Sequence, residues 1–103
     1  MNEPDALQAL AALAHVTRLG ILRLLIQQGP EGLPAGDIAL RLGVLQNTLS
    51  AHLRILHQAH LVVNTREGRV IRYRADHAAI TLNKHLARRA HFIRRTADDG
   101  GDN

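Results

Sequence analysis

The chain has 103 residues and no cysteine, and its 13 Lys and Arg outnumber its nine Asp and Glu, for a formal net charge of +4. This length suits one small domain. The missing cysteine excludes a disulfide framework, a thiolate metal site and a thiol nucleophile. No apolar run approaches the roughly 18 residues of a membrane span, and the acidic N-terminus lacks the basic region of a signal peptide. We therefore expect a cytoplasmic protein without a membrane partner.

The basic charge is concentrated in one part of the chain. Residues 1–40 carry a net charge of −2, whereas residues 41–97 carry ten Arg and Lys84 against two carboxylates, a net of +9. Such a half indicates a surface for a polyanion, although a solvated Arg-rich face would have the same composition. Residues 98–103 are acidic and glycine-rich, and we expect them to form a disordered tail after a domain at residues 1–97.

The predicted elements change character along the chain. Apolar residues at spacings of three and four predict helices at residues 5–14, 16–28, 35–42 and 46–59, with a loop at 30–34. Strands follow at 61–66 and 70–74, joined by a tight turn at Glu67-Gly68. A last helix is predicted at 76–93. The fold class is mainly α with a small β-hairpin, in the order α-α-α-α-β-β-α.

The helices at 35–42 and 46–59 are separated only by Gly43-Val44-Leu45, and a short glycine-containing turn is typical of a helix-turn-helix. In that motif the N-terminal residues of the second helix contact base edges in the major groove of DNA. Asn and Gln can pair with adenine, and Ser and Thr with bases or phosphates. The predicted contacts on this helix are Gln46, Asn47, Thr48, Ser50, Ala51 and Arg54. Its other side, with Leu45, Leu49, Leu53 and Leu56, should face the core.

The hairpin adds a second signal for DNA binding. Its tip carries Arg66 and Arg69, and Arg72 follows on the second strand. An Arg-tipped hairpin beside a recognition helix forms a wing that can reach phosphates or a narrow minor groove. We predict Arg66, Arg69 and Arg72 as wing contacts. An ordinary solvated hairpin is the alternative. The helix-turn-helix and the hairpin together predict a winged helix-turn-helix that binds double-stranded DNA.

The first and last helices carry apolar stripes that predict a homodimer interface. The stripe residues are Leu7, Leu10, Ala14, Ala79, Leu82, Leu86, Ala90 and Ile93. A two-fold dimer would place its recognition helices in successive major grooves, about 34 Å apart, on an inverted-repeat operator. Both stripes could instead face the core of their own chain.

The sequence shows no enzyme. Ser50 and His52 are two residues apart on one helix and cannot face each other, and no phosphate-binding glycine motif occurs. His52 lies at the flank of the apolar face of its helix, where we expect a partly buried, hydrogen-bonded side chain. His15 is expected in the turn between the first two helices.

Several segments resemble the ArsR family of winged-helix repressors. Residues 13–22, which include Thr17-Arg18-Leu19, are similar to the family's "Leu-Ala-x-x-Thr-Arg-Leu-x-Ile-Leu" opening, and residues 37–44, 46–56 and 59–74 resemble its third helix, recognition helix and wing. The resemblance covers residues 5–93. It implies a homodimer that represses an operon and releases DNA when an inducer binds. The DNA-reading positions match at Gln46, Asn47, Thr48, Ser50, Arg54, Arg66 and Arg69.

The inducer positions of that family do not match. Pro34-Ala35-Gly36 stands where the metal-responsive branch has Cys-x-Cys, so the inducer is unidentified and is not a thiolate-bound metal. Relatives that bind zinc on the last helix use carboxylate and His. The candidates here are Asp76, His77, His85 and His91, but nearby Arg charge opposes a cation. We expect no metal or other cofactor. The alternatives are a His-based metal-responsive repressor and a winged-helix protein-interaction module without DNA binding.

Overall fold

The computed structural model describes the backbone of residues 2–101 and the side chains of residues 2–89. The helices are α1 (Glu3–Leu13), α2 (Val16–Gln28), α3 (Ala35–Leu42), α4 (Gln46–Gln58) and α5 (His77–Gly101), with a short 3-10 turn at Gly29–Glu31. The strands are β1 (Leu33–Pro34), β2 (Val62–Glu67) and β3 (Val70–Ala75). The observed order of helices and hairpin confirms the predicted fold class.

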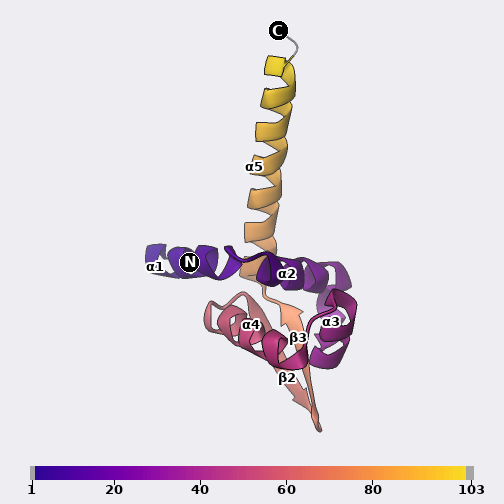
Figure 1. Cartoon of the computed structure of the whole chain (residues 1–103). Coiled ribbons are helices and arrows are strands. Elements are labelled where there is room, and N and C mark those ends of the chain that lie inside the picture. Colours follow the sequence, from indigo (N-terminus) through magenta and orange to yellow (C-terminus); the bar gives the residue numbers. More distant parts are fainter. Residues whose placement is uncertain (1, 102–103) are drawn as a thin grey trace.

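The elements form layers with a projection at each end (Figure 1). Helices α1 and α2 lie above α3 and α4, and the β2–β3 hairpin extends beyond them at the bottom. Helix α5 projects from the opposite side and stands largely apart from the other helices. The core lies between the layers, where α2, α3, α4 and the start of β2 contribute their apolar faces. Its fully buried large side chains are Ile21, Leu22, Leu25, Ile38, Leu49, Leu53, Leu56, Leu61 and Val62.

Local chemistry sets the helix boundaries. The Asn2 side chain accepts a hydrogen bond from the Asp5 backbone N–H (2.9 Å) and caps α1. The Nδ1 atom of His15 accepts from the Thr17 backbone N–H (3.1 Å) and caps α2, so the predicted turn position of His15 is confirmed. Gly43 ends α3 with a left-handed φ of 65°. Glycine adopts that conformation without a Cβ clash, which permits the sharp turn into α4.

The prediction of a loop at 30–34 is wrong in its second half. Leu33 and Pro34 form β1, which pairs antiparallel with β3, so the sheet has three strands in the order β1-β3-β2. Two residues carry no detectable periodicity, and this strand exists only because β3 offers it a free edge. The β2–β3 hairpin agrees with the prediction to within one residue.

Two further expectations fail. Leu45 was expected to face the core but is 77% exposed, because it precedes the helix as the N-cap residue with extended backbone. Helix α5 continues to Gly101 rather than ending at Ile93. No proline interrupts this segment, and a glycine costs a helix only about 1 kcal/mol. Residues 102 and 103 lie outside the described residues.

No single helix among the described residues is long and apolar enough to cross a membrane. Helix α1 and the segment Val16–Glu31 meet that length and hydropathy criterion only as a pair, with a bend of 103° between them.

Candidate nucleic-acid interface

Helix α4 separates apolar and polar side chains onto opposite faces. Leu49, Leu53 and Leu56 are at most 1% exposed and anchor the helix on the core. The predicted contact residues all lie on the exposed side, namely Gln46, Asn47, Thr48, Ser50, Ala51 and Arg54. Leu45 gives no side-chain cap hydrogen bond, so the first N–H groups of α4 point outward without a side-chain acceptor. The helix therefore presents its positive end and a short-chained polar face together.

A groove joins this helix to the wing. Gln46 and Ser50 of α4 face Arg69, Ile71 and Tyr73 at the hairpin across a cavity of about 380 Å³. The segment Pro34–Gly36, at the start of α3, closes one side of it. The fold thus brings two predicted DNA-contact residues of the helix, Gln46 and Ser50, and one of the wing, Arg69, to a single groove.

The two arginines at the wing tip differ in what they contact. Arg66 Nε donates to the Gly68 backbone oxygen (3.1 Å) and so holds the turn of the hairpin. Arg69 is exposed and forms no ion pair or side-chain hydrogen bond with residues 2–89. Arg69 is therefore the tip residue whose guanidinium is available to a phosphate or a base.

Arg72 lies on the other face of the sheet. Successive residues of a strand point to opposite faces, so Arg72 and Arg74 point away from the groove that Ile71 and Tyr73 line. Arg72 Nε lies 3.0 Å from Glu67 Oε1, and its Nη1 donates to the Glu31 backbone oxygen (3.2 Å). Its guanidinium ties the wing to the segment before β1. The sequence grouped Arg72 with the DNA contacts because spacing along a chain does not show which partner a side chain finds.

A cluster of three basic side chains connects α4 with α1 and α2. Arg18 Nη1 lies 3.5 Å from His52 Nδ1, and Arg18 Nε donates to the Ala12 backbone oxygen at the end of α1. The His15 and His52 rings lie 4.6 Å apart, centroid to centroid, with 49° between their planes. The predicted partly buried, hydrogen-bonded state of His52 is confirmed. The sequence did not identify its partner Arg18, which is distant in the chain.

The pKa of His52 is held below its ordinary value. Burial is the largest cause, and the neighbouring His15 and Arg18 add charge repulsion. Each effect disfavours the imidazolium form, so His52 is neutral at neutral pH.

The predicted dimer residues divide into three groups. Leu7 (62% exposed), Leu10 (46%) and Ala14 lie open to solvent. Leu82 and Leu86 are half-buried against the core. Ala79 is completely buried in the core of its own chain. The side chains of Ala90 and Ile93 lie outside the described residues.

The candidate metal ligands whose side chains are described do not come together within the chain. Asp76 Oδ2 accepts from the Ala78 backbone N–H (3.1 Å) and caps α5, while His77 and His85 are exposed. The side chain of His91 lies outside the described residues. Among the side chains that the structure describes, no three His, Cys, Asp or Glu come close enough to hold a metal ion.

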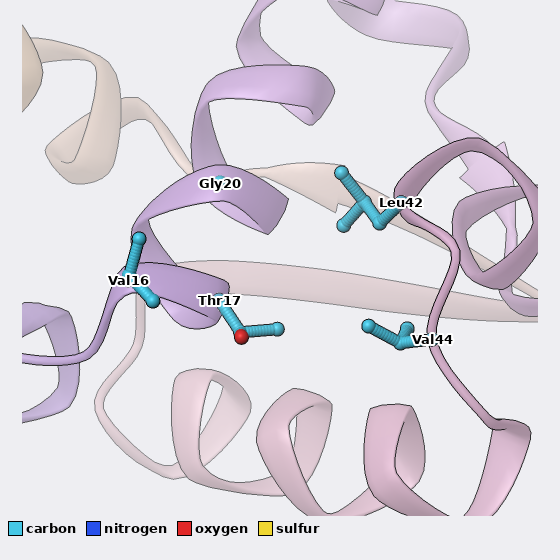
Figure 2. Close-up of a pocket in the computed structure, with 5 residues that line it drawn as sticks. All are labelled: Val16, Thr17, Gly20, Leu42 and Val44. Carbon is cyan, nitrogen blue, oxygen red and sulfur yellow. The ribbon is translucent and has the colours of Figure 1, made fainter.

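A small hollow lies between α2 and the helix-turn-helix turn (Figure 2). Val16, Thr17 and Gly20 line it from α2, and Leu42 and Val44 from the other side, around about 130 Å³. Thr17 and Val44 point toward each other across it. One hydroxyl among apolar side chains does not provide an acid, a base or a nucleophile pair, and this hollow has no catalytic character.

A helix-turn-helix with an exposed polar recognition helix and an Arg-tipped hairpin beside it defines a winged helix-turn-helix DNA-binding domain. Residues 13–65 match the family model described as a helix-turn-helix domain. The chain belongs to the ArsR family of winged-helix transcriptional regulators.

Three proteins illustrate this similarity. The transcriptional regulator NmtR of Mycobacterium tuberculosis is 45% identical over 64 residues, which are 62% of this chain and 51% of NmtR, so the chain spans about half of that relative. The homodimeric winged helix-turn-helix DNA-binding domain of Mb0332 from Mycobacterium bovis superposes with a TM-score of 0.77 at 30% identity, covering 85% of this chain and 80% of that one. The transcriptional repressor BigR from Xylella fastidiosa gives 0.69 at 27% identity, covering 81% and 83%.

Proposed function

We propose that this chain forms a homodimeric transcriptional repressor that binds an inverted-repeat DNA operator through α4 and the wing. The observation that carries the proposal is the single groove onto which Gln46, Ser50 and Arg69 converge. A polar helix face alone would be an ordinary solvated surface. A helix face and an Arg-tipped hairpin at one groove fit a duplex, whose major groove takes the helix while the adjoining backbone lies against the wing.

The proposed contact residues differ in whether their side chains suit base edges or phosphates. Asn47 and Gln46 carry amides suited to the edge of adenine. Thr48, Ser50 and the guanidinium of Arg54 suit phosphates or bases along the same face, and Ala51 allows close approach beside a thymine methyl. Arg69, which no carboxylate among residues 2–89 neutralises, suits a flanking phosphate or a narrow minor groove. Arg66 holds the turn that presents it.

Dimerisation through α1 and α5 follows from surfaces that one chain leaves uncovered. Leu7 and Leu10 are exposed on α1, and α5 projects beyond the rest of the molecule (Figure 1). Covering such apolar surface with a second copy stabilises both. The homodimeric state of the similar Mb0332 domain supports dimerisation of this chain. A two-fold axis would set the recognition helices about one helical turn of DNA apart.

Regulation by an inducer is part of this proposal, and the sequence excludes inducers that bind through cysteine thiolates. The chain has no cysteine, so an inducer cannot be sensed through thiolates. We infer that the protein acts by binding rather than by catalysis and works in the cytoplasm, where its DNA target lies.

Selection of bound duplexes from random DNA, followed by mobility-shift titration, tests the proposal. We expect an enriched inverted repeat and an affinity that falls by orders of magnitude as salt rises from 50 to about 200 mM. Arg54→Ala and Arg69→Ala should each weaken binding of the selected site. Arg23→Ala removes an exposed arginine of α2 away from the groove and serves as the matched control. No enrichment, or equal losses in all three variants, would contradict the proposal.

A further inference from the structure

The cluster of Arg18, His15 and His52 has no part in the DNA contacts described above. It lies where α1, α2 and α4 meet, and Arg18 touches all three elements. Its Nε donates to the Ala12 carbonyl of α1, and its Nη1 lies 3.5 Å from His52 on α4. Arg18 is half-buried, as is His52. One side chain thus links the helix that we assign to dimerisation with the helix that we assign to base recognition.

The contact between Arg18 and His52 fixes the protonation of the histidine. A guanidinium has only N–H donors and no acceptor. A hydrogen bond from Arg18 therefore assigns Nδ1 of His52 as the bare nitrogen of the neutral ring, with the proton on Nε2. Adding a proton to Nδ1 would place two N–H groups against each other and would put a second positive charge 3.5 Å from the guanidinium.

His15 is constrained in the same way. Its Nδ1 accepts from the Thr17 backbone N–H at 3.1 Å, and a backbone N–H cannot act as an acceptor. A proton on this nitrogen would remove the cap of α2. Since the rings of His15 and His52 are in contact at 4.6 Å between centroids, two imidazolium rings there would also repel each other.

No carboxylate among residues 2–89 offsets the positive charge of this cluster. Within the part of the chain whose side chains are described, the one ion pair joins Arg72 to Glu67, so no carboxylate lies within 4.0 Å of the three groups. Helix α1 contributes the neutral Ala12 carbonyl to the cluster. It also contacts α4 where Gln8 Nε2 donates to the Gln58 carbonyl at 3.3 Å. The charged and titratable groups that face His52 are Arg18 and His15, both from α2 and its cap.

We propose that Arg18 is a positioning residue for the recognition helix, acting through neutral His52, and that protonation of His52 loosens α4 and weakens specific DNA binding. The proposal rests on the DNA-binding function proposed above. The ligand of the switch is the proton itself. A proton on His52 would replace its hydrogen bond with Arg18 by two adjacent cations.

The proposal predicts a change in operator affinity on acidification that is opposite to the change expected from net charge alone. Acidification adds positive charge to a protein as a whole, and added positive charge strengthens binding to phosphates. A protein without the cluster would therefore bind DNA more tightly at pH 5.5 than at pH 7.5. The switch predicts that the selected operator duplex is bound more weakly at pH 5.5, while binding to a scrambled duplex is unchanged or stronger.

Fluorescence anisotropy of the selected and scrambled duplexes at pH 7.5 and 5.5 measures this directly. We expect the unmodified chain to lose about tenfold in operator affinity at pH 5.5, the effect of one proton whose affinity differs by one pKa unit between two states. His52→Gln keeps an oxygen acceptor for Arg18 but cannot take up a proton in this pH range. The operator affinity of this variant should therefore not fall at pH 5.5. His57→Gln removes an exposed histidine of the same helix and should respond as the unmodified chain does. Arg18→Met should bind more weakly at pH 7.5 and respond less to pH.

Two results would overturn the proposal: operator binding that is equal or tighter at pH 5.5, or a pH response that His57→Gln removes as fully as His52→Gln. Circular dichroism at both pH values distinguishes a loosened α4 from global unfolding, since only the latter removes most of the helical signal. Failure of the proposed DNA-binding function can be distinguished from failure of this proposal, because it would appear as no selected duplex at pH 7.5. In that case imidazole ¹⁵N NMR of the chain without DNA tests the Arg18–His52 contact directly. A proton on His52 Nδ1 at pH 7.5 would refute that contact.

Discussion

Leu33 and Tyr73 are cross-strand partners, although about two fifths of the chain separates them. Their pairing makes β1 the third strand of the sheet and fastens the base of the wing to the segment that leads into α3. The helix-turn-helix and the wing are therefore held together by backbone pairing as well as by side-chain packing. This connection keeps Arg69 and α4 at one groove.

Gly32, directly before β1, should be intolerant of any side chain. Its φ is 61°, and a Cβ there would collide with the Tyr73 backbone oxygen and with the Arg74 side chain. Gly32→Ala combines backbone strain with a steric clash, and we expect a loss of about 2–4 kcal/mol in the free energy of unfolding. Urea denaturation measures it. Gly20→Ala is the control, because a Cβ at this helical position meets nothing within 4 Å and should be neutral or stabilising by up to about 1 kcal/mol. Equal losses in the two variants would contradict the described approach of Gly32 to β3.

Arg72→Ala should affect DNA binding less than Arg69→Ala does. The guanidinium of Arg72 is engaged by Glu67 and by the Glu31 carbonyl on the sheet face away from α4. Losing this partly exposed pair should cost at most about 1 kcal/mol of stability. Arg69→Ala should instead lower the slope of log K against log salt by about one, as expected for one lost phosphate contact. Salt titrations of the two variants compare them, and a larger slope change for Arg72→Ala would reverse our assignment.

A charge on the exposed side of α1 should dissociate the dimer. Leu10→Asp places a carboxylate on surface that we assign to the two-fold interface, where an unpaired buried charge is strongly unfavourable. Sedimentation equilibrium should show a shift from dimer toward monomer. Leu40→Asp changes a leucine of α3 that is 81% exposed and should leave the dimer intact. A dimer that survives Leu10→Asp would place the interface elsewhere.

The stability of the fold should decline with acidification because of His52. Its pKa in the folded chain is below its ordinary value of about 6.5, with burial as the first cause and His15 and Arg18 as the others. A base with a depressed folded pKa binds fewer protons in the native state than in the unfolded state. Its contribution is therefore complete above about pH 6.5 and is lost as the pH falls toward the folded value. Denaturant midpoints at pH 7.5, 6.5 and 5.5 should fall less steeply for His52→Gln than for the unmodified chain.

Much of the candidate site could be predicted from the sequence because its determinants are local. The apolar period of Leu49, Leu53 and Leu56 decides which side of α4 is exposed, and that side carries every predicted contact of the helix. Gly43 marks the turn, since few other residues adopt its left-handed φ. Each of these signals involves residues within a turn or two of one another, so neighbours in sequence suffice to specify them.

Contacts between distant segments required the tertiary structure. The burial of Ala79 depends on where α5 meets α2, the direction of Arg72 on its pairing with Glu67, and β1 on the free edge of β3. The joint between Arg18 and His52 brings together side chains from two helices that chain spacing does not relate. The helix-turn-helix spacing and the Arg-tipped hairpin in the basic second half of the sequence indicated a small DNA-binding domain, and the missing cysteine excluded thiolate sensing. Only the packing of α1, α2 and α4 decided which of its twelve arginines positions the recognition helix, because side-chain partners are chosen in space rather than along the chain.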